Sequence, residues 1–151
     1  MRFFHCQVGT TSLLLAGACC LALGLAGCGD PSGVGKTVPV AGKVTVDGRP
    51  VKAGTVSFRP DRSKGNAALH EPFAEIDAEG NYKLFTGRKE GAPLGWYRVA
   101  VMAAEPVEVG NLSGQARWFA DPKYASVETS GLTIEVVENA APGTYDLKLT
   151  R

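Results

Sequence analysis

The sequence is poor in the side chains that most often carry chemistry. Only four cysteines and two histidines occur in 151 residues, and after residue 28 the chain has no cysteine and a single histidine, His70. That part of the chain therefore has no disulfide and no cysteine–histidine cluster for zinc. His70 is expected in an exposed loop, and no Gly-x-Ser-x-Gly motif accompanies it. We expect a protein that is not an enzyme and that has no metal and no cofactor.

An excess of charge of one sign is also missing. The chain has 16 basic and 15 acidic residues, and Arg2 is the only charged residue among the first 27, so residues 28–151 carry 15 of each sign. A domain that binds nucleic acid typically carries a cluster of Lys and Arg together with a basic net charge. Nucleic acid is therefore not an expected partner.

The longest apolar run lies near the N-terminus. It opens with Leu13 and continues without a charged residue to Leu25, a length of 13 residues. A transmembrane helix needs about 20 apolar residues, and extending the run back to Thr10 adds polar groups. A positive end at Arg2, an apolar middle and an exit of small residues are the parts of a secretory signal. We expect residues 1–27 to be a cleaved signal peptide, with an uncleaved membrane helix as the alternative.

The four residues at the end of this run, Leu25-Ala26-Gly27-Cys28, resemble the lipobox of bacterial lipoproteins. In that family the cysteine marks the site of cleavage and lipidation. The resemblance implies that Cys28 carries a lipid, and that the protein is exported and held on a membrane of the cell envelope, inner or outer. Residues 28–37, which contain Gly, Asp, Pro and Ser, are expected to be a flexible tether. Residues 38–151 are expected to form one domain.

Short segments of alternating apolar and polar residues run from residue 40 to the C-terminus. Such alternation predicts half-buried strands, and Gly and Pro fall between the segments. The segments centre on 40–46, 51–58, 74–76, 82–84, 97–101, 132–136 and 145–149. Seven short strands without a helical segment favour an all-β fold, a seven-stranded antiparallel β-sandwich. The expected core positions are Val44, Val56, Ile76, Leu84, Val99, Ile134 and Leu147.

Three stretches of this domain, in order, resemble the carboxypeptidase regulatory-like family, and the tail is similar to that of small envelope lipoproteins built on such a domain. They are Ala41–Val51 with Gly54–Phe58, Ile76–Leu84 and Gly95–Val99, followed by a tail with Pro122–Tyr124, Ser130–Leu132 and Tyr145–Leu147. The resemblance implies a transthyretin-like (immunoglobulin-like), Greek-key sandwich that is a non-catalytic binding or accessory domain. It implies no catalytic residues.

The expected function is thus a lipid-anchored, non-enzymatic binding or structural module of the cell envelope. The alternative is an accessory domain that recognises a carbohydrate or a peptide and serves an exported enzyme. An envelope protein or a glycan would be the partner in either case, and the oligomeric state is left open.

The connection from Ala104 to Gly131 is the longest segment without clean alternation. Connections beyond about 12–15 residues are usually functional or disordered. This one carries aromatic side chains, so we expect it to be ordered, with a short helical turn and with Tyr124 as a buried anchor. Its candidate binding surface consists of Arg117, Trp118, Phe119 and Asp121. The alternative is that these aromatic residues only fix the connection onto the sandwich.

One hairpin turn offers several oxygen ligands. Asp77 and Glu79 flank it together with Asn81, but the spacing lacks the other ligands of a calcium loop. We expect a solvated hairpin turn here.

Overall fold

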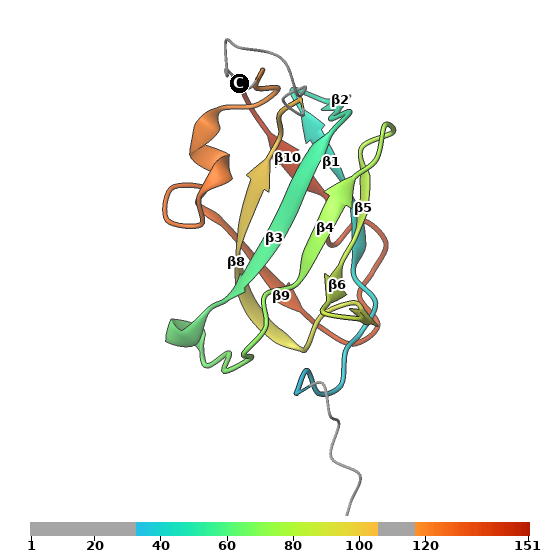
Figure 1. The fold of residues 1–151 in the computed structure, drawn as a ribbon, viewed down its shortest axis with the longest axis vertical. Helices are drawn as coiled ribbons and strands as arrows, with labels where there is room; N and C mark the ends of the chain where they lie inside the picture. Colours follow the sequence, from blue (N-terminus) through green and yellow to red (C-terminus); the bar gives the residue numbers. More distant parts are fainter. Residues whose placement is uncertain (1–32, 106–116) are drawn as a thin grey trace, which may run out of the picture.

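The computed structural model describes residues 33–105 and 117–151 (Figure 1). The expected signal peptide, Cys28 and the middle of the long connection lie outside these residues. The described chain is all-β, with two short 3-10 helices, η1 and η2. The strands are β1 (Ala41–Val46), β2 (Arg49–Pro50), β3 (Gly54–Pro60), β4 (Phe73–Ile76), β5 (Asn81–Lys83), β6 (Phe85–Thr86), β7 (Lys89–Glu90), β8 (Gly95–Met102), β9 (Leu132–Val136) and β10 (Leu147–Leu149). The helices are η1 (Arg62–Lys64) and η2 (Pro122–Ala125).

The strands form one curled sheet whose main path is β10-β1-β5-β4-β3-β8-β9. These seven strands correspond to the seven alternating segments of the sequence, and β2, β6 and β7 are two-residue additions at the turns. One part of the prediction is wrong: β1 and β10 run parallel, with Val44 opposite Leu147. A hairpin forces its two strands to be antiparallel. Since β10 follows β9, at the other end of the sheet, no such constraint applies to it.

Strand β1 changes partners half-way along its length. Residues 41–43 pair with β5, whereas Val44–Val46 pair with β10, and the end of the strand also pairs with β2. Gly42 lies at the closest approach, because a Cβ there would be 2.4 Å from the carbonyl oxygen of Tyr145. The turn to β2 is made by Asp47 and Gly48, both with positive φ (48° and 79°), as a tight two-residue hairpin requires.

The core lies on the inner face of this curled sheet. Six of the seven expected core residues are buried: Val44, Val56, Ile76, Leu84, Val99 and Leu147. The seventh, Ile134, is only partly buried although it packs against the core. It lies on β9, which ends the sheet and has a neighbouring strand on one side only. The alternation therefore located the inward positions, but it did not show which strand would be at an edge.

The first described residues lie against the domain. Val34 is buried, Val38 pairs with Ala92 through an N–H···O bond of 2.9 Å, and Lys36 Nζ lies 2.6 Å from Glu138 Oε1. The chain is thus in contact with the sheet from Val34 onward. Among the described residues, no helix has the length and apolar character needed to cross a membrane.

Candidate binding surface

The candidate surface begins where β8 ends. Beyond Met102, residues 103–105 pair with residues 117–119: Glu105 N–H donates to the Arg117 carbonyl (3.0 Å), and Phe119 N–H donates to the Ala103 carbonyl (2.8 Å). Ala104 and Trp118 form the bridge between these two bonds. Trp118 is therefore fixed on a backbone extension of the sheet.

All four residues of the predicted surface line one open depression of about 580 Å³. Arg117, Trp118, Phe119 and Asp121 are joined there by Pro122 and by Arg151 from the C-terminus. Arg151 follows β10, which is far from Trp118 in sequence. Arg151 lines the depression because of the place that β10 takes in the sheet. No local sequence signal therefore identifies Arg151 as a lining residue.

The four predicted residues have different surroundings. Trp118 keeps 40% of its surface exposed, whereas Phe119 is partly buried and packs on the core. Asp121 is the N-cap of η2: its Oδ1 accepts the Lys123 N–H at 2.9 Å, as expected for an Asp just before a Pro-initiated helical turn. Phe119 and Asp121 thus have structural partners, and the surfaces of Arg117 and Trp118 are the ones that face solvent.

Two cations line the same depression as the exposed indole. Arg117 Nη1 lies 3.6 Å from Glu105 Oε1, and Arg151 Nε lies 3.9 Å from Asp47 Oδ2. Both arginine side chains are largely exposed (80% and 75%), and ion pairs of this kind hold a side chain only weakly in water. Both guanidinium groups can therefore turn towards a ligand. An exposed aromatic side chain and two weakly paired cations in one depression are suited to a planar or ring-shaped group that bears polar or anionic substituents.

Tyr124 anchors this region to the sheet. It is the buried residue of η2, with 7% of its surface exposed, and η2 packs on β8. Its hydroxyl lies 3.1 Å from Thr150 Oγ1, and the Asp121 N–H donates to the Thr150 carbonyl at 3.0 Å. The expected helical turn, the buried Tyr124 and the more exposed Trp118 are confirmed.

The other candidate side chains have local structural roles. His70 is exposed, as expected, and the hydroxyl of Ser63 donates to Asp61 Oδ1 at 2.6 Å. Asp77 Oδ1 accepts the Asn81 and Glu79 N–H groups at 2.7 and 3.0 Å, which closes the hairpin turn. Hydrogen bonds from Asn81, side chain and backbone, lower the pKa of Asp77. Within residues 33–105 and 117–151, no three His, Cys, Asp or Glu side chains gather as metal ligands would.

The comparisons with known proteins identify no relative: no family model, no curated protein and no solved structure matches this chain.

Proposed function

We propose that this protein is a lipid-anchored, non-enzymatic binding module of a bacterial cell envelope, whose recognition surface is the depression around Trp118. The anchor is Cys28, and the apolar run that ends at Leu25 is the signal that exports the chain. The observation that carries the binding role is the exposed Trp118 in one depression with two weakly paired arginines, on a backbone fixed by the sheet.

The fold that we propose is a transthyretin-like, Greek-key sandwich of the carboxypeptidase regulatory-like kind. The curl of the sheet supports it, since β9 and β10 lie behind β3 and β4 (Figure 1). The Tyr145 hydroxyl also reaches the backbone of Val137 at 3.3 and 3.4 Å, so the segments that follow β9 and precede β10 are in contact.

The proposed anchor also orients the domain. Only residues 29–32 separate Cys28 from Gly33, a reach of at most about 18 Å for an extended chain. The end of the domain that carries Gly33 would then face the membrane. The end of β8 and the C-terminus lie at the opposite end of the molecule (Figure 1). The Trp118 depression would therefore face away from the lipid, where a soluble or wall-bound partner can reach it.

The absence of an enzymatic role is part of the proposal. Among the described residues, His70 is exposed, Ser63 and Asp61 serve the cap of η1, and Asp77 serves a turn. A catalytic acid–base pair needs side chains that converge on one reacting atom. None of these groups is placed for such a task.

The second candidate is an accessory domain that recognises a carbohydrate or a peptide for an exported enzyme. The specific support is the indole itself, because an exposed tryptophan beside charged side chains stacks well on a sugar ring. The Trp118→Ala and Trp96→Phe variants, screened on glycan and peptide arrays, test it. Trp96 is a matched control, because its ring lies on another part of the sheet with Lys64 Nζ 3.6 Å from the ring centroid.

We expect a bound glycan or peptide that is retained by Trp96→Phe and lost by Trp118→Ala. Binding that survives Trp118→Ala would contradict the assigned surface. No binding to either array would remove the carbohydrate- or peptide-recognising candidate.

A further inference from the structure

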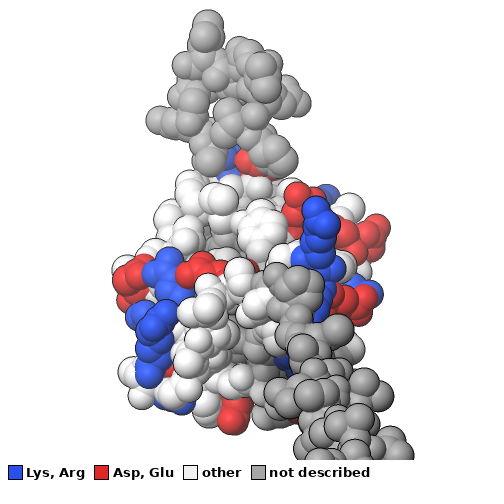
Figure 2. All heavy atoms as spheres, turned by 60° about the horizontal axis from the view of Figure 1, so that its bottom comes forward, with Lys and Arg blue, Asp and Glu red and all other residues white. Residues whose placement is uncertain are grey.

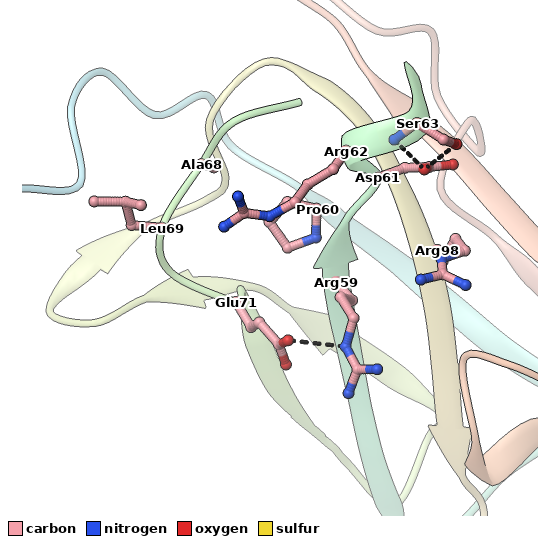
Figure 3. Close-up of a pocket in the computed structure, with 9 residues that line it drawn as sticks. All are labelled: Arg59, Pro60, Asp61, Arg62, Ser63, Ala68, Leu69, Glu71 and Arg98. Atoms are coloured by element: carbon pink, nitrogen blue, oxygen red, sulfur yellow. Dashed lines mark hydrogen bonds and ion pairs between the residues drawn. The ribbon is translucent and has the colours of Figure 1, made fainter. Parts of the chain in front are cut away.

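A second hollow, of about 390 Å³, lies at the end of the molecule opposite the Trp118 depression, where β3 leads into η1 (Figure 3). Three arginines line it, Arg59, Arg62 and Arg98, together with an apolar wall that includes Ala68 and Leu69. Leu69 is 78% exposed, the highest value among the exposed large apolar side chains described. Guanidinium groups beside an exposed apolar side chain are the components of a site for an amphipathic anion.

Two of these arginines are direct neighbours across the sheet. Arg59 on β3 and Arg98 on β8 are opposite one another in the antiparallel register, so their side chains leave the same face of the sheet. Like charges directly opposite each other are destabilising unless an anion lies between or beside them. The protein itself therefore supplies carboxylates at this point.

Those carboxylates are bound to Arg59. Glu71 Oε1 lies 2.9 Å from Arg59 Nε, and Glu128 Oε1 lies 2.7 Å from Arg59 Nη1. Glu128 also accepts the Ser126 hydroxyl, and this bond, its backbone hydrogen bond and the charges of Arg59 and Arg98 lower its pKa. Arg59 Nε and Nη1 are thus already paired with carboxylates of the fold, which makes Arg59 the less suitable partner for a ligand.

Within residues 33–105 and 117–151, Arg98 makes no ion pair of this kind, although its charge acts on Asp61 and Glu128. Its Nε is a buried donor without a hydrogen-bond partner, and it is the sole side-chain nitrogen or oxygen of that kind in residues 33–105 and 117–151. Asp61, one of the two acids on which the charge of Arg98 acts, is held by Ser63, whose N–H and hydroxyl donate to Asp61 Oδ1 at 3.1 and 2.6 Å. An unpaired buried donor raises the free energy of the folded state. A ligand carboxylate that draws the guanidinium into a two-donor contact would relieve it.

Asn66 fixes the start of the loop that forms the apolar wall. Its Nδ2 donates to the Trp96 carbonyl at 2.9 Å, and its Oδ1 accepts the Ala68 N–H at 3.0 Å. These two bonds hold the loop that presents Ala68 and Leu69. The apolar wall is therefore built into the fold and does not depend on a partner.

The surrounding charge limits which anion fits. Figure 2, which brings this end of the molecule forward, shows basic and acidic side chains next to one another without a broad patch of either sign. Asp61, Glu71 and Glu128 together offset the charges of the three arginines. A dianion such as phosphate would bring two negative charges close to these three carboxylates, whereas a monoanion brings only one. Electrostatic repulsion therefore favours a monoanion beside Arg98.

We propose that this hollow, the Arg98 site, binds the free carboxylate of a short peptide or small organic acid, with Arg98 as the carboxylate partner and Leu69 as the apolar contact. The proposal does not depend on the Trp118 depression, and it concerns the end of the domain that would face the membrane if Cys28 is the anchor. The probes are N-acetyl-alanyl-alanine, its C-terminal amide, acetate and inorganic phosphate, titrated into the full chain in detergent by calorimetry. The ¹⁵N resonance of Arg98 Nε is followed in parallel.

We expect the dipeptide acid to bind, to shift the Arg98 Nε resonance, and to bind about tenfold or more tightly than its amide. Arg98→Gln should weaken binding of the dipeptide acid by about tenfold or more. Arg88→Gln, a control at an exposed turn, should leave affinity unchanged. If acetate binds as tightly as the dipeptide acid, the ligand is a small organic acid and a peptide ligand is excluded.

Three results would overturn the proposal. The first is equal binding of acid and amide, and the second is unchanged acid binding by Arg98→Gln. The third is a preference for phosphate or for phosphatidylglycerol vesicles over the dipeptide acid, which would make this hollow a phosphate or lipid site. Arg98→Lys is the control for misfolding, because it keeps the positive charge and removes only the planar guanidinium fork. Its affinity should lie between those of the wild type and Arg98→Gln.

Discussion

Replacing Tyr124 with alanine tests how the long connection is attached to the sheet. Tyr124 is 7% exposed, packs with η2 on β8, and lies within hydrogen-bond distance of Thr150. Truncating a buried large aromatic side chain costs about 3–5 kcal/mol, because transfer free energy is lost and a cavity remains. The total free energy of unfolding of a domain of this size is about 5–15 kcal/mol. The Tyr124→Ala variant should therefore unfold more than about 10 °C below the wild type.

Two further variants divide this effect into parts. Tyr124→Phe removes only the hydroxyl and its contact with Thr150, so it should cost about 1 kcal/mol. Trp118→Ala removes a side chain that is 40% exposed. The space it leaves opens to solvent and no closed cavity forms, so we expect about 1–2 kcal/mol. Thermal and urea unfolding, followed by circular dichroism in the β-sheet band, measures all three variants.

The order of the three midpoints decides the question. We expect Tyr124→Ala to be the least stable, and we expect Trp118→Ala to keep the wild-type spectrum at room temperature. If Trp118→Ala is instead the most destabilising change, the indole is part of the fold. The depression around it would then no longer qualify as a recognition surface.

Three other predictions follow from particular contacts. Gly42→Ala should lower stability by about 1–3 kcal/mol in urea unfolding, since the new methyl group would lie 2.4 Å from a backbone carbonyl oxygen; an unchanged midpoint would contradict the close approach. Leu84→Ala should cost about 2–5 kcal/mol, whereas Phe85→Ala, at a neighbouring position that is 44% exposed, should cost far less; similar losses would contradict the inward-facing position of Leu84. Asp77→Asn tests the pH dependence of stability. Hydrogen bonds of the hairpin turn hold the folded-state pKa of Asp77 below its unfolded value of about 4. The stabilisation from Asp77 is therefore complete above the unfolded pKa and is lost as pH falls through the folded pKa. The urea midpoints of wild type and variant should therefore differ at pH 6 and converge in acid, and a difference that grows in acid would show that the sign is wrong.

Local sequence patterns were sufficient for the strands and their inward faces. Period-two alternation located Val44, Val56 and Leu147 because each inner face of a strand repeats every second residue. The Asp47–Gly48 turn also carries a local sequence signal, since few residue pairs accept positive φ at two consecutive positions.

The relations between distant strands were not readable in this way. The parallel pairing of β1 with β10, the edge position of Ile134 and the approach of Arg151 to Trp118 all depend on where β9 and β10 lie in the sheet. The pairing of Arg59 with Arg98 likewise requires the register between β3 and β8. Neither Arg59 nor Arg98 has a local sequence signal that identifies its cross-strand partner, because strand order is set by the packing of the whole core.

Mass spectrometry of the mature protein, purified from the membranes of the cells that make it, tests the central claim most directly. We predict a mature chain that begins at Cys28 and carries at least two acyl chains, because one chain alone holds a protein only marginally on a bilayer. A Cys28→Ser variant should keep residues 1–27 and carry no acyl chain. A wild-type chain with a free Cys28 thiol, or with residues 1–27 still attached, would contradict the account.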